Sequence, residues 1–407
     1  MTKSVSPSRK KVYSAVSLFA GVGGIELGFK ETGKFRIVYA NEFDKNACKT
    51  YAENNPETRL DSRDIHEVKT TEIPNSDLIM AGFPCQAFSI AGYRKGFEDE
   101  RGDLFFEMLR IINAKKPRVV FIENVKNLVT HDHGNTFKVI REALVENGYY
   151  IKWKVLNAKD YGNIPQNRER IYVVGFKNEY DYKNFDFPRP IELTRTIHDI
   201  IDFDSEKSEK YYYFANKQPF YEKLVPEITS HNTIYQWRRQ YVRENKAGVV
   251  PTLTANMGTG GHNVPLILTN SNKIRKLTPK ETFNAQGFPP SFKLPNISSG
   301  QLYKQAGNSV VVPVIYRLAK QIVNAMGHKR EEIREMPTPK KYALIFCVVR
   351  GRFSGGSYVK KFSNSREKLK KFIKYSGIPL LTDEEYLKLV RKKTNQTFYE
   401  FFMIEEC

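Results

Sequence analysis

The chain has 407 residues, enough for a large core and for more than one domain, and its four cysteines are far apart in the sequence. This spacing excludes a small disulfide scaffold and indicates no zinc or other metal site, so we expect a reducing, cytoplasmic setting. The 65 lysines and arginines outnumber the 45 aspartates and glutamates, and the formal charge of +20 favours a polyanionic partner.

Residues 1–12 predict a basic tail without the apolar core of a signal peptide, and no later segment reaches the length of a membrane span. From residue 13 to residue 176, short apolar runs alternate with stretches of helical periodicity. This alternation predicts an α/β fold whose mainly parallel sheet is covered by helices on both faces. The expected strands are residues 12–20, 35–42, 77–83, 118–125 and 169–177, and the expected helices are residues 25–32, 45–54, 102–116 and 133–148.

The alternation ends after Phe176. Residues 177–268 are loop-rich and contain the basic stretch IYQWRRQYVRENK and the glycine-rich stretch PTLTANMGTGGHN, so we expect an inserted second domain there. Regular patterning returns over residues 269–328, which predicts that the chain rejoins the first domain and ends it with a long helix over residues 307–326. Residues 329–407 predict a polar linker and a small α+β extension with three strands and basic helices, whose role the sequence leaves open.

The strand ends carry the residues that point to a ligand, because ligands of such sheets collect beyond the carboxyl ends of the strands. After the first strand, AGVGG opens a helix, but a dinucleotide fingerprint laid on Gly21 and Gly23 puts Glu26 at its third glycine position. A classical NAD site is therefore disfavoured. Glu42 could bind both ribose hydroxyls and Asp64 an adenine amino group, or each could be a solvated loop carboxylate. Together they favour a nucleoside ligand whose charged tail is a carboxylate.

Cys85 lies in the stretch AGFPCQAFSIAG, just after an apolar run. A cysteine at a strand end can be a small buried hydrophobe, whereas a polar, glycine-flanked loop suits a reactive thiolate. Six further motifs accompany FPCQAFS in order, namely FAGVGG, NEFD, FIENV, QNRER, KLTPKETFNAQGFP and QAGNSV. The whole set resembles the DNA cytosine-C5 methyltransferases of the bacterial restriction-modification type, and the resemblance covers nearly all of residues 13–326.

The resemblance implies a chemistry that needs particular residue types. Carbon 5 of cytosine is too weak a nucleophile to attack a methyl sulfonium directly, so a thiolate must first add to carbon 6 and convert the ring into an enamine. By the family pattern Cys85 is that nucleophile, and Glu123 protonates or hydrogen-bonds cytosine N3. Arg168 is expected to point into the base and phosphate pocket, and Arg170 to support Glu123 or the Cys85 loop. These four residues form the expected catalytic set.

The resemblance also implies S-adenosylmethionine as the cofactor, bound to the Rossmann-like fold of S-adenosylmethionine-dependent methyltransferases. Phe43 departs from the tryptophan that many members of the family have, although a phenylalanine can still stack on adenine. The expected cofactor-binding residues are Phe19, Gly21, Gly23, Glu42, Phe43, Asp64, Ile65, Asn308 and Ser309.

The target cytosine must leave the duplex stack to be reached, so a second surface must hold the DNA. We expect the inserted segment to be this target-recognition domain. Its paired arginines Arg238 and Arg239 could read guanine edges or bind phosphates. The expected DNA-binding residues are Gln86, Ser89, Arg238, Arg239, Thr252 and Thr254.

Three other functions fit parts of the sequence. A tRNA cytosine-C5 methyltransferase would share the pocket but would ordinarily have a much shorter insertion. A non-catalytic regulatory relative predicts loss of Cys85, Glu123 or the glycine turn, and all are intact. An NAD-dependent enzyme would need a hydride-transfer site, and none is evident. We therefore expect a monomeric enzyme that acts on double-stranded DNA, without a membrane partner, alongside a restriction endonuclease that shares its site.

Overall fold

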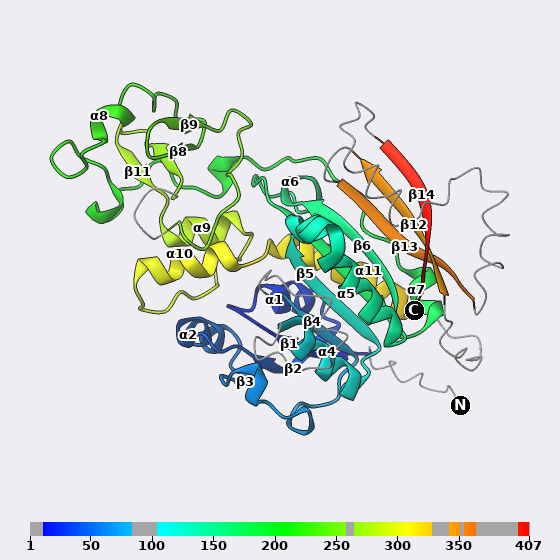
Figure 1. Ribbon diagram of the computed structural model, residues 1–407. Coiled ribbons are helices and arrows are strands. Elements are labelled where there is room, and N and C mark those ends of the chain that lie inside the picture. The colour runs from blue at the N-terminus through cyan, green and yellow to red at the C-terminus, as the bar shows by residue number, and fades with distance from the viewer. Residues whose placement is uncertain are drawn as a thin grey trace, which may run out of the picture.

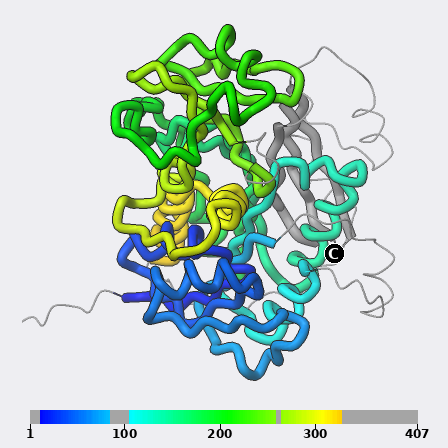
Figure 2. The backbone as a smooth tube through the Cα atoms, turned by 90° about the vertical axis from the view of Figure 1, so that its left-hand side faces the viewer, coloured from blue at the N-terminus to red at the C-terminus, as the bar shows by residue number. Residues whose placement is uncertain are grey.

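The computed structural model describes residues 11–83, 104–257 and 264–327, together with the backbone of residues 342–350, 354–363 and 398–406. The strands within these ranges form two sheets, a large sheet of ten strands and a small sheet of four (Figure 1). Figure 2 shows the small sheet and its loops at one end of the molecule and the amino-terminal strands toward the other. The chain therefore has a large domain and a smaller domain at one end of the molecule.

Five parallel strands form one half of the large sheet, in the order β3-β2-β1-β4-β5, with β3 at its edge. Beside β5, the strand β7 runs antiparallel, and β6 runs antiparallel to β7. The predicted α/β fold with a mainly parallel sheet is confirmed. The strands span Tyr13–Leu18 (β1), Phe35–Asn41 (β2), Arg59–Asp61 (β3), Leu78–Ala81 (β4), Val119–Val125 (β5), Tyr150–Asn157 (β6) and Glu169–Phe176 (β7).

Different helices cover the two faces of the large sheet. Successive residues of a strand point to opposite faces, so each strand contributes to both cores. In β5, Val120 and Ile122 join the core that α4 and α5 cover, whereas Val119 and Phe121 join the core that α1 and α11 cover. No helix of the described ranges is long and apolar enough to cross a membrane. The helices of the large domain span Gly24–Lys30 (α1), Lys45–Asn54 (α2), Leu104–Lys115 (α4), Asn135–Glu146 (α5), Ala158–Tyr161 (α6), Glu179–Asn184 (α7), Pro279–Ala285 (α9), Ser299–Asn308 (α10) and Val312–Gly327 (α11).

The single long helix expected over residues 307–326 is wrong, because the structure has two helices there. α10 ends at Asn308, and α11 begins at Val312 with Pro313 in its first turn, where a backbone N–H has no intrahelical partner in any case. The interruption puts Ser309 in a loop next to the glycine turn, and this loop contributes to the functional site described below.

The small domain does not coincide with residues 177–268. At the start of this predicted range, α7 packs against α11 and β6, and Asp181 forms an ion pair with Arg118 at 2.6 Å. The start of the range therefore belongs to the large domain. At its end, the small sheet includes a strand beyond residue 268. The small domain contains the helix Tyr221–Leu224 (α8) and the strands Tyr235–Trp237 (β8), Val242–Glu244 (β9), Leu266–Leu268 (β10) and Ile274–Lys276 (β11), in the sheet order β11-β10-β8-β9.

The carboxyl-terminal strands continue the large sheet. β12 (Tyr342–Arg350) pairs antiparallel with both β13 (Ser354–Ser363) and β14 (Phe398–Glu406), and β13 pairs with β6 through Tyr358 and Lys152. The three expected strands of the extension are therefore present, although they join the large sheet instead of forming a separate unit. The expected basic helices between them, and residues 1–10 of the expected amino-terminal tail, lie outside the described residues.

Glu26, in the first turn of α1, is fully buried, and this burial raises the pKa of its carboxyl from 4.5 to about 7. Between these two values the unfolded chain loses the proton while the folded chain keeps it. We therefore expect the free energy of unfolding to fall by about 3 kcal/mol as the pH rises from about 4.5 to about 7. In Glu26→Gln this loss should be absent. Urea unfolding between pH 5 and pH 8 measures this change. If the free energy of unfolding depended on pH equally in the natural chain and in Glu26→Gln, the expectation would be contradicted.

Candidate active site

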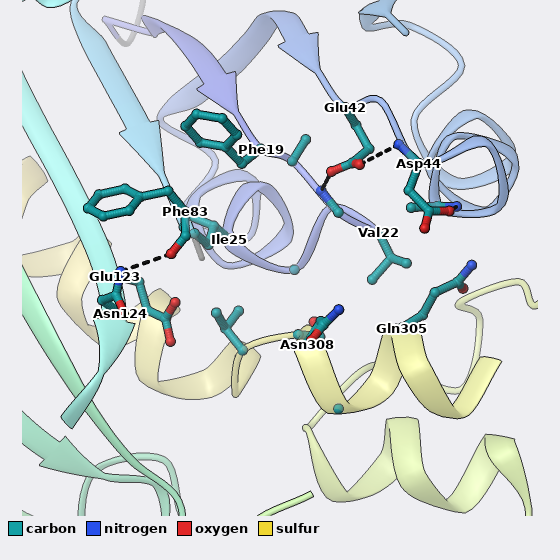
Figure 3. Close-up of a pocket in the computed structure, with 18 of the residues that line it drawn as sticks. Phe19, Val22, Ile25, Glu42, Asp44, Phe83, Glu123, Asn124, Gln305 and Asn308 are labelled. Carbon is teal, nitrogen blue, oxygen red and sulfur yellow. Dashed lines mark hydrogen bonds between the residues drawn. The ribbon is translucent and has the colours of Figure 1, made fainter. Parts of the chain in front are cut away.

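The carboxyl ends of β1, β2, β4 and β5 surround one cavity of about 490 Å³, together with the loop between α10 and α11 (Figure 3). The cavity takes its lining from segments far apart in the chain, so the sheet topology creates it. Most of the expected cofactor-binding and catalytic residues line this one cavity, namely Phe19, Gly21, Glu42, Phe43, Asp64, Ile65, Glu123, Arg168, Arg170, Asn308 and Ser309.

The turn after β1 owes its shape to left-handed backbone conformations. Phe19, Gly21 and Gly23 have φ angles of 57°, 57° and 87°, and a non-glycine residue such as Phe19 rarely adopts such an angle outside functional turns. Gly23 does not line the cavity, in contrast to the expectation. Gly24 does, and a Cβ atom there would lie 2.7 Å from the Ser309 hydroxyl. The glycines therefore bring the first turn and the loop after α10 into close contact.

Glu42 connects the end of β2 to this turn. Its Oε2 accepts a hydrogen bond from the backbone N–H of Gly21, and its Oε1 accepts one from that of Asp44, both at 2.8 Å (Figure 3). Burial raises the pKa of this carboxyl, while the two backbone hydrogen bonds oppose the rise. Each carboxylate oxygen keeps a further lone pair, so Glu42 can still accept hydrogen bonds from a ligand.

The lining of the cavity also includes an exposed ring and a second acid. Phe43 is 67% exposed, so a flat ligand can stack on its ring without displacing core side chains. Asp64 accepts hydrogen bonds from the backbone N–H of His66 at 3.0 Å and contacts the His66 ring at 2.5 Å, and both interactions lower the pKa of its carboxyl. The buried Ile65 lies beside it. An aromatic, an aliphatic and an ionised acidic group thus meet where the sequence predicts a nucleoside.

Glu123, in β5, lies deep in the same cavity. Its carboxylate is 3.1 Å from the Nε of Arg170, and the Cβ that Gly82 lacks would lie 3.4 Å from its Oε2. Burial raises the pKa of Glu123, although the positive charges of Arg170 and Arg168 partly oppose this effect. The carboxyl group therefore keeps its proton to a higher pH than an exposed glutamate does, as a proton donor requires.

Arg168 lines the cavity, but most of its hydrogen-bond donors are directed at backbone groups of the protein. Its side chain is 2% exposed, and its guanidinium donates hydrogen bonds to the carbonyl oxygens of Leu253, Gly307 and Ser309. It therefore holds the end of α10 and the loop after it against the segment between β9 and β10. Arg170, two residues along the same extended segment, is the arginine that contacts Glu123.

Cys85, Gln86 and Ser89 lie outside the described residues. The strand that leads toward them is held in place, because the side-chain amide of Asn124 donates a hydrogen bond to the carbonyl oxygen of Phe83 at 2.8 Å (Figure 3). Phe83 precedes Cys85 by two residues and lines the cavity. The segment that carries the cysteine thus leaves the sheet directly beside Glu123 and Asn124.

The remaining expected DNA-binding residues divide into two groups. Arg238, Thr252 and Thr254 line a second cavity between the small domain and the segment before β7. Arg239 does not line it and sits at the tip of the β8–β9 hairpin, with a left-handed φ angle of 66°. Thr252 and Thr254 also line a third cavity, which they share with Arg170 and Asn308 of the active site.

Some residues of the site gave no sequence signal. Lys304 in α10 forms an ion pair with Asp44 at 2.7 Å across the cavity mouth, and Gln305 hydrogen-bonds Thr50 in α2 at 2.8 Å. These pairs join positions more than 250 residues apart, so no spacing rule could find them. Among the described residues, no group of histidine, cysteine and acidic side chains could hold a metal ion.

Comparison with known proteins gives consistent matches. Residues 13–324 match the family of C-5 cytosine-specific DNA methylases. The type II methyltransferase M.Bsp6I of Bacillus sp. (strain RFL6) is 62% identical over 311 residues, which cover 76% of this chain and 98% of that protein. The type II methyltransferase M.HhaI of Haemophilus parahaemolyticus is 41% identical over 324 residues, covering 77% and 95%. A mutant of Spodoptera frugiperda DNMT2 shares the fold, with a TM-score of 0.59 and 22% identity over 76% of this chain and 99% of that one.

Gly307, in the last turn of α10, tests the close contact between this helix and the segment that contains Thr254. A Cβ atom there would lie 2.2 Å from the carbonyl carbon of Thr254, which is backbone and cannot rotate away. We expect Gly307→Ala to lower the free energy of unfolding by about 1–3 kcal/mol and to weaken ligand binding in the cavity. Gly300→Ala, in the same helix with open space around it, should be neutral or stabilising. Urea unfolding measures the free energy of unfolding of both variants. Equal values for Gly307→Ala and Gly300→Ala would contradict the close contact.

Proposed function

The chain belongs to the C-5 cytosine-specific DNA methylases and is a DNA cytosine-5-methyltransferase, and from that premise we propose a covalent mechanism on a cytosine flipped out of duplex DNA. The observation that supports this mechanism most strongly is the position of Glu123. Its buried carboxyl lies in the cavity beside Arg170, next to the strand that leads to Cys85. The proposal thus places a proton donor and a nucleophile on neighbouring strand ends.

In the proposed reaction, the Cys85 thiolate adds to carbon 6 of the cytosine, and the electron pair of the 5,6 double bond moves toward carbon 5. Glu123 donates a hydrogen bond or its proton to N3, where negative charge develops, and Arg170 fixes the orientation of the carboxyl group. After methylation, the proton on carbon 5 leaves to solvent. The bond between sulfur and carbon 6 then breaks, the double bond forms again, and N3 returns to Glu123 any proton that it received.

We assign S-adenosylmethionine to the 490 Å³ cavity, whose volume lies in the usual range for a small-molecule site. When bound, this cofactor supplies an electrophilic methyl group. The residues present fit its parts: Phe43 offers a ring for adenine, Glu42 has lone pairs for two ribose hydroxyls, and Asp64 is an acceptor for an amino group. Asn308 and Ser309 line the cavity from the loop after α10.

The partners follow from charge and family. A formal charge of +20 favours binding to the phosphate backbone, and the small domain is the part that we expect to recognise a short site in the duplex. Because the relatives described above are type II methyltransferases, we infer that the methylation protects the DNA of the cell from a restriction endonuclease with the same site. Such a role places the enzyme in the cytoplasm.

A mechanism-based trap tests the covalent step. In duplex DNA with 5-fluorocytosine at the target position, fluorine cannot leave as a proton does, so the enzyme and the DNA should remain joined when the cofactor is present. We expect a band of increased mass on a denaturing gel for the natural chain and none for Cys85→Ala. Cys85 would be ruled out as the nucleophile by an adduct that persists in Cys85→Ala. It would also be ruled out if no adduct formed at a site that the enzyme methylates when it contains cytosine.

Glu123→Gln tests the proton donor. The amide keeps a hydrogen-bond donor in place but has no ionisable proton, so we expect kcat to fall about 100-fold. In the natural chain the rate should decline as the pH rises through the raised pKa of Glu123, because the protonated form is lost. Methyl incorporation measured from pH 6 to pH 9 should show this decline, and the variant should lack it. An unchanged profile in the variant would assign the decline to another group.

A further inference from the structure

The small domain presents a polar cavity of about 480 Å³ that the catalytic steps do not use. Its wall is the β8–β9 hairpin, in which Gln236 lies directly opposite Arg243. Directly opposed residues of antiparallel strands project from the same face of the sheet. The neighbouring residues Tyr235 and Trp237 project from the other face, into the apolar core of the small domain. The hairpin therefore directs one polar face toward the cavity.

Most polar groups in this cavity are already hydrogen-bonded within the protein. The Thr252 hydroxyl donates to the carbonyl oxygen of Asn167 at 2.5 Å, and the Thr254 hydroxyl contacts the Oδ1 of Asn256 at 2.7 Å. The side-chain amide of Asn245 donates to the carbonyl oxygen of Val249. These groups give the cavity its shape, but their donors are occupied.

Gln236, Arg238 and Arg243 line the same cavity and differ in this respect. Gln236 is 92% buried, since only 8% of its surface is exposed, yet no described residue hydrogen-bonds its side-chain amide. Arg238 and Arg243 are exposed, and neither forms an ion pair with any residue in the described part of the chain. The polar atoms of the Gln236 amide are not among the buried atoms that lack a partner, so the amide faces the open cavity, where a ligand can take the place of water. These side chains are therefore available to an acceptor-rich ligand.

The position of the cavity identifies that ligand. The polar cavity of the small domain shares Asn167, Thr252 and Thr254 with the third cavity described above. The third cavity shares Arg170 and Asn308 with the active site. A duplex whose flipped base occupies the active site would place the neighbouring base pairs along this path. Guanine presents two acceptors, O6 and N7, in the major groove, and an arginine guanidinium matches both.

We propose that Arg243 selects a guanine beside the target cytosine by donating to its O6 and N7, and that the Gln236 amide fixes the same or the adjacent base. This inference rests on the proposed function and assigns the choice of site to β8 and β9, not to the hairpin tip. Thr252 and Thr254 then shape the cavity instead of reading bases.

The test is methylation of duplexes with random bases around a cytosine, followed by bisulfite sequencing. The natural chain should require guanine at a defined position, and Arg243→Ala should reduce that preference about 10- to 100-fold there and at no other position. Arg243→Lys, which keeps the charge but loses the two-pronged donor, should show the same loss. In the natural chain, 7-deazaguanine at that position should reproduce the loss, with no further effect in Arg243→Ala.

Arg239→Ala is the matched control, because it removes the same charge from the same hairpin outside the cavity. It should weaken methylation of all sequences equally. An Arg243→Ala protein that loses activity equally on every sequence, or keeps its guanine preference, would overturn the inference while leaving the enzyme a DNA methyltransferase. Failure of the natural chain to methylate any duplex would instead overturn the proposed function.

Discussion

The hydrogen bonds of one buried cation, Arg168, hold the active site together. Its guanidinium donates hydrogen bonds to the carbonyl oxygens of Leu253, in the segment between β9 and β10, and of Gly307 and Ser309, beside the 490 Å³ cavity. A buried charge without a directly bonded carboxylate needs hydrogen-bond acceptors for its donors, and three carbonyl oxygens accept from its two terminal nitrogens, while the buried Nε has no partner among the described residues. A lysine could not span these oxygens, because it lacks the planar fork of donors. The relative position of the segment around Leu253 and the loop after α10 therefore depends on this side chain.

This arrangement explains why the two arginines of QNRER differ in role. They project from the same side of an extended segment, yet Arg168 is enclosed by the two loops, and Arg170 reaches Glu123. One arginine builds the wall of the cavity and the other adjusts the carboxyl group within it. Because Arg170 lowers the pKa of Glu123 while burial raises it, the proton affinity of that carboxyl reflects a balance between desolvation and a neighbouring charge.

Much of this architecture could be predicted from the sequence, because apolar strands buried on both faces have a strong signal. Leu78–Ala81 and Val119–Val125 are of this kind, and the residues at their ends do meet in one cavity. β6 gave a weaker signal, since it alternates lysines with apolar residues directly after a helix. The break at Ser309 depends on tertiary contacts, and the opposition of Gln236 and Arg243 depends on strand register, so local periodicity reveals neither.

β6 also bears on how the carboxyl-terminal extension came to join the fold. The family match ends at residue 324, before β12, β13 and β14 begin. Strands at the border of a sheet commonly carry lysines that discourage pairing with other chains, and β6 has Lys152 and Lys154. Yet Lys152 lies opposite Tyr358 of β13. β6 thus carries the lysines typical of a border strand although β13 pairs with it, and the last three strands extend the sheet beyond the residues that match the family.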